Sequence, residues 1–466
     1  MGKKTNFQKN QIITLDIDDI TDLGFGVGRV GGAVVFVADT VPGDRIEAKI
    51  IKVNSSYLVA RAEKILVRSP SYVKGRCTEG CRSCAYKCIS YSEELRRKED
   101  GVRRLFSHGE LSGISVNPIV PSPEEIRYRN KAQYPVSIEN GRYVVGYYAP
   151  KSHRVTPVGD CPLTPAVFSE ICREVLGFLE ENGISVYNEE SGDGLVRHIY
   201  LRRGEVSGEI LLTLVVTEPR LPESEELVRR ITERFPEAVG VLLNVNRERT
   251  NVVLGDEYIT LYGRDYIFDT LAGVELKITA PSFYQVNHGA AELLYAKARE
   301  LAALEGGEVL LDLFCGAGSI GLSMAKDARE LIGIEIVDSA VICARENAAR
   351  LGAKNARFFT GDASDTEALL SSAEAELGRK IAPDVIILDP PRGGCDERLI
   401  RFVARLDPKR IVYISCNPKT LARDVVLFRA LGYEAADVTP FDLFPCTGHV
   451  ESVVRLERRL DVDMRR

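Results

Sequence analysis

Residues 385–418 read VIILDPPRGGCDERLIRFVARLDPKRIVYISCNP, and the rest of the chain is organised around this stretch. Two apolar runs of strand length end abruptly, the first at Asp389 and the second just before Cys416, with a helix-like interval between them. Ligands of an open parallel sheet bind beyond the carboxyl ends of its strands. The stretch therefore predicts a parallel α/β sheet in which a carboxylate and a thiol face one crevice.

Strands alternate with helices around this stretch, so we expect a Rossmann-like domain over residues 276–466. Its glycine-rich turn, in EVLLDLFCGAGSIGLSMA (308–325), also satisfies the GxGxxG fingerprint of nicotinamide dehydrogenases. Glu335 ends the next strand and suits the ribose hydroxyls of NAD or S-adenosylmethionine equally. Asp312 favours S-adenosylmethionine because a carboxylate there suits the methionine ammonium group, and Asp362 suits the adenine amino group. The methyltransferase interpretation therefore leads.

The bulk composition is that of a soluble, globular, multidomain chain. It has 466 residues, 45% hydrophobic and 27% charged, and its length suggests about three domains. The start, MGKKTNFQKN, has no apolar signal region, and no uncharged apolar run approaches the roughly 18 residues of a membrane span. We expect a cytoplasmic monomer with no membrane partner. Because the net charge is −6, any RNA contact must come from local basic patches.

Residues 8–67 contain short strand-like runs separated by Gly, Pro and Asn turns, the pattern of a small β-barrel of the oligonucleotide-binding kind. Basic side chains decorate these runs and suit either an RNA-binding face or an ordinary solvated surface. The stretch GFGVGR (24–29) resembles that of a TRAM domain, a small RNA-binding barrel. The basic residues are Arg29, Arg45, Lys49, Lys52, Arg61 and Lys64.

Four of the eleven cysteines lie close together, at Cys77, Cys81, Cys84 and Cys88. Disulfides seldom persist in the cytoplasm, so clustered thiols there indicate a soft metal ion. Four local cysteines fit a tetrahedral zinc site, whereas an iron-sulfur cluster often takes three local ligands and a distant one. Cys161, in the turn GDCPL (159–163), is the candidate distant ligand. We favour a [4Fe-4S] cluster on Cys77, Cys81, Cys84 and Cys161, with zinc as the alternative.

Residues 68–275 predict an α+β middle domain that contains the cysteine cluster. A basic helix is expected over about 92–112, packed on the catalytic domain, although its arginines are equally typical of a solvated face. Short strands with few long helices follow. Basic and aromatic residues of the kind that stack on and clamp RNA occur at Arg127, Tyr128, Arg129 and Lys131.

Ordered motifs in the C-terminal half resemble those of the RNA uracil-5-methyltransferase family: SFYQVN (282–287), DLFCGAG (312–318), LDPPR (388–392), SCNP (415–418) and HVES (449–452). With the barrel and the cysteines, the resemblance covers nearly the whole chain and is greatest to the 23S ribosomal RNA members. It implies a class I methyltransferase domain and a [4Fe-4S] cluster. Two departures are the short gap between Cys77 and Cys81 and the additional thiol of Cys88.

The resemblance and the chemistry together assign the catalytic roles. Uracil C5 is a poor nucleophile, but addition of the Cys416 thiolate to C6 makes an enolate that accepts a methyl group. The C5 proton must then leave, and we assign its removal to Glu451. Asp389 accepts from uracil N3–H, Gln285 bridges base and cofactor, and Phe283 or Tyr284 stacks on a flipped base. The residues assigned to the cofactor are Gln285, Asp312, Phe314, Gly316, Ser319, Glu335, Asp362 and Asp389.

The sequence leaves other functions and RNA substrates open. Structured RNA is the expected partner, with 23S ribosomal RNA favoured and transfer RNA second. Cytosine-5 methylation uses the same covalent logic, but Arg392 follows the two prolines where a second cysteine would aid elimination, although Cys395 lies nearby. Adenine methylation would leave Cys416 without a role. An RNA-binding iron-sulfur protein without catalysis would need only the barrel and the cysteines.

Overall fold

The computed structural model describes residues 7–75, 77, 81–150, 152–363, 365 and 368–459. The N-terminal strands close into a barrel in the order β1-β2-β3-β5-β4. Buried and exposed residues alternate along β1, so that Ile13, Leu15 and Ile17 point into the barrel core, as expected for strands with one buried face. The barrel strands are β1 (Ile12–Ile20), β2 (Phe25–Val30), β3 (Ala33–Ala38), β4 (Arg45–Val53) and β5 (Tyr57–Val67).

The middle sheet has the order β13-β12-β11-β10-β7-β8-β9. Helices α2 (Ala166–Glu181) and α3 (Ser224–Arg234) pack on one face, where Phe168, Phe178 and Leu227 are fully buried. The opposite face reaches the catalytic domain, because Tyr200, Leu211 and Leu242 belong to a core shared with it. The strands are β7 (Lys131–Glu139), β8 (Arg142–Tyr148), β9 (Val155–Pro157), β10 (Val196–Arg203), β11 (Ile210–Val216), β12 (Ala238–Val245) and β13 (Glu257–Gly263).

The catalytic sheet has the order β18-β17-β16-β19-β20-β22-β21-β6. Its neighbours from β18 to β20 are parallel, whereas β22 is antiparallel to both β20 and β21. Most residues of these strands are buried, as expected for strands covered on both faces. The strands are β6 (Ser115–Val116), β16 (Val309–Leu313), β17 (Glu330–Glu335), β18 (Ala356–Thr360), β19 (Val385–Leu388), β20 (Arg410–Ser415), β21 (Tyr433–Phe441) and β22 (Glu451–Arg458).

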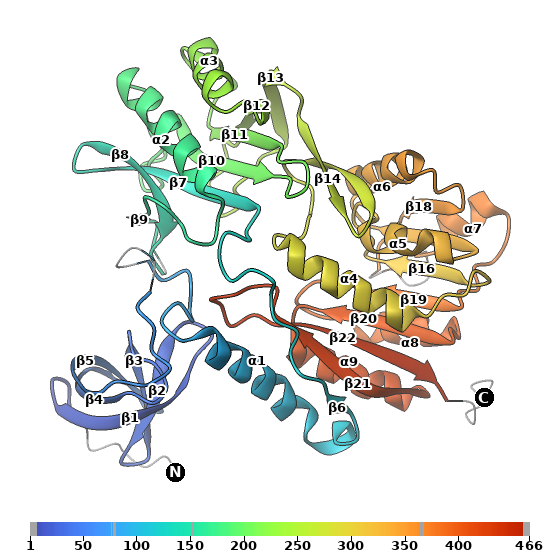
Figure 1. Cartoon of the computed structure of the whole chain (residues 1–466), viewed down its shortest axis with the longest axis horizontal. Coiled ribbons are helices and arrows are strands. Elements are labelled where there is room, and N and C mark those ends of the chain that lie inside the picture. Colours follow the sequence, from blue (N-terminus) through green and yellow to red (C-terminus); the bar gives the residue numbers. More distant parts are fainter. Residues whose placement is uncertain are drawn as a thin grey trace.

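Helices cover both faces of this sheet and confirm the predicted Rossmann-like fold (Figure 1). The strand order reverses between β16 and β19, and a crevice at such a switch point is where ligands of open α/β sheets bind. A hairpin of β14 (Tyr266–Leu271) and β15 (Val274–Thr279) packs beside α6. The helical elements are α4 (His288–Ala302), α5 (Ser319–Met324), η2 (Ala325–Asp327), α6 (Asp338–Leu351), α7 (Ser371–Leu377), α8 (Glu397–Arg405) and α9 (Pro418–Ala430).

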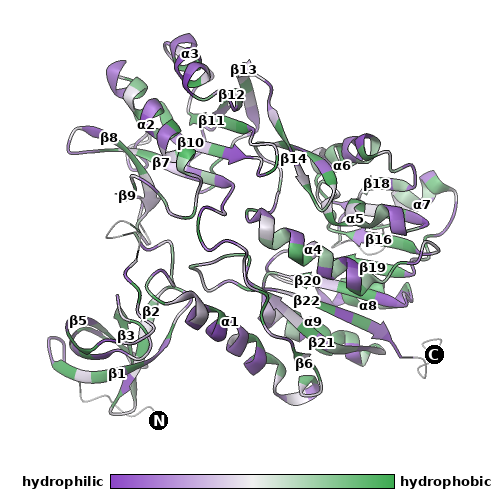
Figure 2. Ribbon diagram, in the orientation of Figure 1, coloured by the Kyte–Doolittle hydropathy of each residue, from purple (hydrophilic) through white to green (hydrophobic). Residues whose placement is uncertain are grey.

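Helix α1 (Tyr91–Phe106), followed by η1 (Gly109–Leu111), lies between the barrel and the catalytic sheet (Figure 1). Val102 and Phe106 are buried in the core of the catalytic domain, while much of the rest of α1 is hydrophilic (Figure 2). Arg97 forms an ion pair of 2.6 Å with Asp19 of the barrel. Strand β6 then joins the edge of the catalytic sheet beside β21. Thus α1 and β6 pack on the C-terminal domain, although they precede the strands of the middle domain in the sequence.

Helices in the described part of the chain all lack the combination of length and apolar character that crossing a bilayer requires.

Candidate active site

Cys416 and Glu451 are brought together by the pairing of β20 with β22. These strands are antiparallel, and Ser415 is paired with Ser452. One step beyond that pair, Cys416, directly after β20, comes opposite Glu451, the first residue of β22, because antiparallel partners run in opposite directions along the chain. Glu451 is 5% exposed and Cys416 is half-buried. A thiol and a carboxyl group therefore face each other at one end of the sheet.

The local sequence around Cys416 holds its loop in place. Asn417 caps α9, because its Oδ1 accepts from the backbone N–H of Lys419 at 3.1 Å. Pro418 occupies the first turn of α9, where its missing N–H costs nothing. The Asn417 Nδ2 donates to the carbonyl of Arg392 at 3.0 Å. This bond joins the SCNP loop to the DPPR loop, so that Asp389 and Arg392 stay beside the thiol.

Burial and neighbouring charges raise the pKa values of the acidic groups in this crevice. Burial raises the pKa of Cys416 to about 11, and the negative charges of Glu451 and Asp389 add to the effect while Arg392 opposes it. The pKa of Glu451 is raised to about 8 by burial first and by Asp389 second. Burial raises the pKa of Asp389 to about 7. Arg392 is thus the cation that favours ionisation of Cys416 and Glu451.

The glycine-rich turn after β16 forms the other side of the crevice. Gly316 donates its N–H to Glu335 Oε2 at 3.0 Å, and Val337 donates to Oε1 at 3.0 Å, so β17 and the turn are locked together. Phe314 has a positive φ of 65°, which few non-glycine residues adopt. The arrangement places the start of α5, at Ser319, over the strand ends.

Asp312, near the end of β16, is fully buried, and only one of its two carboxylate oxygens has a hydrogen-bond partner among the described residues. Its Oδ2 accepts from the N–H of Gly321 at 2.9 Å, whereas its Oδ1 has no hydrogen-bond partner among the described residues. Burial is the main reason that its pKa is raised to about 8. A buried oxygen without a partner is costly unless a ligand supplies the missing donor. Asp362 lies two residues beyond the end of β18, at the exposed edge of the same crevice.

The two aromatic residues of the SFYQVN loop, Phe283 and Tyr284, differ in their accessibility to a substrate base. Tyr284 is buried and donates to Asp269 Oδ2 at 2.8 Å, so it is a core residue. Phe283 is 72% exposed. The Gln285 side chain contacts the Tyr295 hydroxyl, which lies 2.8 Å from Ser319 Oγ. Of the two candidates for base stacking, Phe283 alone is accessible.

Sequence reasoning missed the residues that hold this loop from the middle domain. Arg202 is buried and donates to the carbonyls of Ser282 at 2.7 Å and of Ala280 at 3.3 Å. Asn130 Nδ2 donates to the Gln285 carbonyl at 2.9 Å. Neither residue lies in a motif, and no spacing in the sequence connects them to residues 80 or 155 positions away.

The predicted cluster thiols also come together. Cys77, Cys81, Cys84 and Cys161 line a cavity of about 620 Å³, and the thiols of Cys77 and Cys81 are in hydrogen-bond contact. Cys446, which the sequence did not indicate, lines the same cavity. Cys88 does not line this cavity; it lies beside Gly75 and lines a smaller pocket together with Cys84. Within the described residues no group of three or more His, Cys, Asp or Glu side chains is close enough to hold a metal ion.

A second cavity, of about 570 Å³, opens beside Cys416 between the barrel, α1 and the catalytic loops. Its basic lining includes Arg104, Arg392 and Lys419, and among the described residues these three make no ion pair within 4.0 Å. Most other arginines on the surface are paired with carboxylates. Cations without partners around a cavity are suited to a polyanion.

Comparison with known proteins places this arrangement in a family. Residues 205–459 match the model of the tRNA (uracil-5-)-methyltransferase family, and residues 6–62 match the TRAM domain. The chain belongs to the tRNA (uracil-5-)-methyltransferase family. The predicted family and barrel are thereby confirmed, and the protein is an S-adenosylmethionine-dependent RNA methyltransferase.

Relatives of this methyltransferase match it along nearly its whole length. Uncharacterized RNA methyltransferases of Halalkalibacterium halodurans and Clostridium acetobutylicum are 38% and 35% identical to it; the first alignment covers 96% of this chain and 97% of the relative, and the second 98% and 99%. The solved structure of Pyrococcus abyssi tRNA (uracil-54, C5)-methyltransferase with S-adenosyl-L-homocysteine is 27% identical, with a TM-score of 0.76 over 95% of this chain and 99% of that one.

Proposed function

We propose that this methyltransferase methylates C5 of a uridine in structured RNA through a covalent bond between Cys416 and uracil C6. The observation that carries the proposal is the opposition of the Cys416 thiol and the buried Glu451 carboxyl group across β20 and β22, with Asp389 at the end of the adjacent strand β19. A nucleophile, a base and a group that reads the base edge are the minimum set for this reaction.

The residues would act in sequence on the flipped base. The Cys416 thiolate adds to C6, and the electron pair that this displaces makes C5 nucleophilic. Bound S-adenosylmethionine supplies the methyl group. Glu451 then takes the proton from C5, the C5–C6 double bond re-forms, and the Cys416 sulfur leaves C6. Ionised Asp389 accepts from N3–H, a donor that neutral cytosine lacks, and this contact favours uracil over cytosine.

The cofactor assignment is supported by the donors and acceptors of the crevice. Asp312 Oδ1 is a buried acceptor that lacks a partner among the described residues, and the ammonium group of the methionine moiety would supply one. Ile336 and Val337, directly after Glu335, are apolar and exposed, which suits contact with an adenine ring. Gln285, Phe314, Gly316, Ser319 and Asp362 complete the proposed cofactor site.

For the RNA itself we propose 23S ribosomal RNA, on the strength of the resemblance in motifs to those members. Transfer RNA is the second candidate, favoured by the overall similarity to the P. abyssi enzyme. The cavity beside Cys416, with its unpaired cations, accommodates the backbone of either. Mass mapping of 5-methyluridine in both RNAs, from cells with and without the gene, tests the proposal. Loss of the modified uridine from 23S RNA supports it, loss from transfer RNA selects the alternative, and no loss from either RNA contradicts it.

Rising pH should accelerate release of 5-methyluridine. Glu451 must be ionised to accept the C5 proton, and Asp389 must be ionised to accept from N3–H; their pKa values are raised to about 8 and about 7. Below about pH 7 both ionised fractions grow with pH, so release of product from the methylated adduct, in which Cys416 has already reacted, should increase about a hundredfold per pH unit. The increase should be about tenfold per unit between pH 7 and 8, and the rate should level off above about pH 9. Single-turnover release rates in buffers of constant ionic strength measure the profile. A rate that falls over this range would show that the reaction requires a protonated acid and not two ionised carboxylates.

We further propose that Cys77, Cys81, Cys84 and Cys161 hold a [4Fe-4S] cluster. The four thiols line one cavity and come from the expected local and distant positions, which suits the ligand set of such a cluster. When bound, the cluster would join the segment that carries Cys77, Cys81 and Cys84 to the turn that carries Cys161. The proposal requires the thiols to close in around the cluster, because without it their side chains are not arranged as a ligand set.

Replacing Cys161 with serine should abolish the cluster, whereas replacing Cys88 should not, because Cys88 lies outside the cavity. Protein purified without oxygen should contain roughly four iron and four sulfide per chain, and the Cys161→Ser variant almost none. Iron and sulfide analysis with the visible absorption spectrum measures the difference. One zinc and no sulfide per chain, or cluster loss in Cys88→Ser as well, would refute this ligand set.

A further inference from the structure

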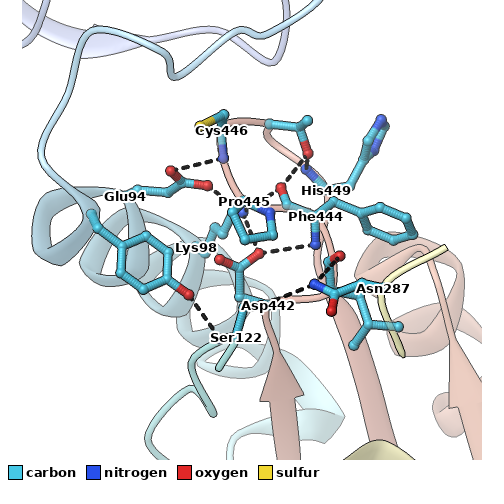
Figure 3. A network of polar contacts seen from close by, with 12 residues as sticks. Glu94, Lys98, Ser122, Asn287, Asp442, Phe444, Pro445, Cys446 and His449 are labelled. Atoms are coloured by element: carbon cyan, nitrogen blue, oxygen red, sulfur yellow. Dashed lines mark hydrogen bonds and ion pairs between the residues drawn. The ribbon is translucent and has the colours of Figure 1, made fainter. Parts of the chain in front are cut away.

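The 442–447 turn connects β21 to the segment that ends in Glu451, and contacts from several distant parts of the chain hold it (Figure 3). Asn287 Nδ2 donates to the Leu443 carbonyl at 3.0 Å, and the Tyr128 hydroxyl donates to the Pro445 carbonyl at 3.0 Å. The backbone N–H of Tyr86 donates to the Cys446 carbonyl at 2.9 Å. The catalytic domain, the middle domain and the cysteine loop therefore meet at this turn.

Lys98 of α1 is the centre of these contacts. Its Nζ donates to Glu94 Oε1 at 2.6 Å, to Asp442 Oδ1 at 2.7 Å and to the Phe444 carbonyl at 3.2 Å. The three charged side chains are almost inaccessible, with exposures of 1% for Lys98, 3% for Glu94 and 0% for Asp442. One buried cation thus joins two buried carboxylates and the backbone of the turn.

Glu94 and Asp442 also accept hydrogen bonds from the backbone of the turn. Glu94 Oε2 accepts from the N–H of Cys446 at 3.1 Å, and Asp442 Oδ1 accepts from the N–H of Phe444 at 3.2 Å. Cys446 has a positive φ of 69°, a conformation that costs energy in a residue with a side chain and persists only when its surroundings impose it. The ion network therefore sets the path of the turn together with the contacts from the middle domain and the cysteine loop.

A contribution to the stability of the fold does not by itself explain this buried ion network. Buried ion pairs are often replaceable by well-packed apolar residues without loss of stability, so they are weak evidence for a stabilising role. This network adjoins the strand pair that holds Glu451. Glu451 is the first residue of β22 and is paired with Phe441, the last residue of β21, and Asp442 directly follows Phe441. Residues 442–450 lie outside the strands, so contacts other than strand pairing set the path of the chain that leads into Glu451.

We propose that Lys98 is a positioning residue that, through the 442–447 turn, holds Glu451 against the C5 proton of the substrate. The inference rests on the proposed function and deepens it. Lys98 touches neither base nor cofactor in this scheme, and it acts only on the second half of the reaction. Its loss should therefore slow proton removal more than it slows methyl transfer.

The test compares Lys98→Met with Arg103→Met. Both Lys98 and Arg103 lie on α1 and pair with a glutamate four residues earlier, but Arg103 is exposed and Glu99 only half-buried. In single-turnover assays, Lys98→Met should transfer methyl to RNA within about threefold of wild type while 5-methyluridine release falls on the order of tenfold or more, so that methylated covalent adduct accumulates. Arg103→Met should match wild type in both steps. Equal slowing of both steps, or no adduct, would overturn the proposal.

A triple variant, Lys98→Met with Glu94→Gln and Asp442→Asn, guards against a simple folding defect, because it leaves no buried carboxylate without a counter-ion. The melting temperature should recover toward that of wild type, whereas adduct should still accumulate. Recovery of normal product release together with stability would show a merely structural role and overturn the inference. Wild-type enzyme that makes no 5-methyluridine would contradict the proposed function itself, which is a different outcome.

Discussion

Replacement of Cys416 by alanine should abolish methyl transfer and leave S-adenosylmethionine binding nearly unchanged. Without the thiol no adduct forms at C6, and C5 remains too poor a nucleophile, so the rate should fall at least about 10³-fold. The thiol lies at the end of β20, whereas the proposed cofactor residues Asp312 and Glu335 lie on β16 and β17. Incorporation of label from methyl-labelled cofactor into RNA measures the rate, and calorimetry measures cofactor binding.

Cys343→Ala is the matched control for this variant. Cys343 lies on α6 near Lys277, away from both cavities, and its removal should leave turnover as in wild type. RNA containing 5-fluorouridine should trap the wild-type enzyme as a denaturation-resistant adduct, because fluorine at C5 cannot leave as a proton does. The alanine variant should give no adduct. Residual turnover at a tenth of the wild-type rate would contradict a covalent mechanism.

Replacement of Glu451 by glutamine should trap the enzyme on methylated RNA. Glutamine keeps the size and hydrogen-bonding capacity of glutamate but cannot accept the C5 proton, so Cys416 still attacks and methyl is still transferred while elimination stalls. Release of free 5-methyluridine should fall about 10²-fold or more. A denaturing gel of unmodified RNA incubated with labelled cofactor should show a slow-moving, labelled complex of protein and RNA.

The control for this second variant is Glu457→Gln, on the same strand but exposed beside Arg455. It should form no lasting adduct and should turn over normally. If Glu451→Gln also turns over normally, or stays folded without forming an adduct, another group or water removes the proton. The variant has a further use, because its pH profile should lose the contribution of a group whose pKa lies at about 8.

Much of the catalytic domain could be predicted because its signals are local. Asp389 and Cys416 each follow an apolar run, and runs of this kind became β19 and β20, whose carboxyl ends lie side by side in the sheet. The glycine-rich turn followed its strand, β16, and opened into α5 as its sequence indicated. The hydrophobic period of the strands, the turn residues and the motif spacing predict these elements because each depends only on residues close together in the sequence.

The association of Glu451 with Cys416 could be anticipated only through the resemblance to a family, because no local pattern pairs residues on β20 and β22. The same is true of Phe283 and Tyr284. They are adjacent and chemically similar, yet one is exposed and the other is buried against Asp269. Which aromatic side chain faces the substrate depends on the packing of the hairpin and α4 around the loop.

The sequence by itself determined the fold class, the family motifs and the residues able to carry the chemistry, because strand period, glycine turns and the order of motifs are properties of neighbouring residues. Only the tertiary structure decided how these parts support one another. Lys98 looks like one more cation on a basic helix, and Cys446 like an isolated thiol, until the fold brings Asp442 to within 2.7 Å of the first and places the second beside the cluster cysteines. Such contacts join positions more than 300 residues apart, and burial, which removes the competing water, gives them their strength.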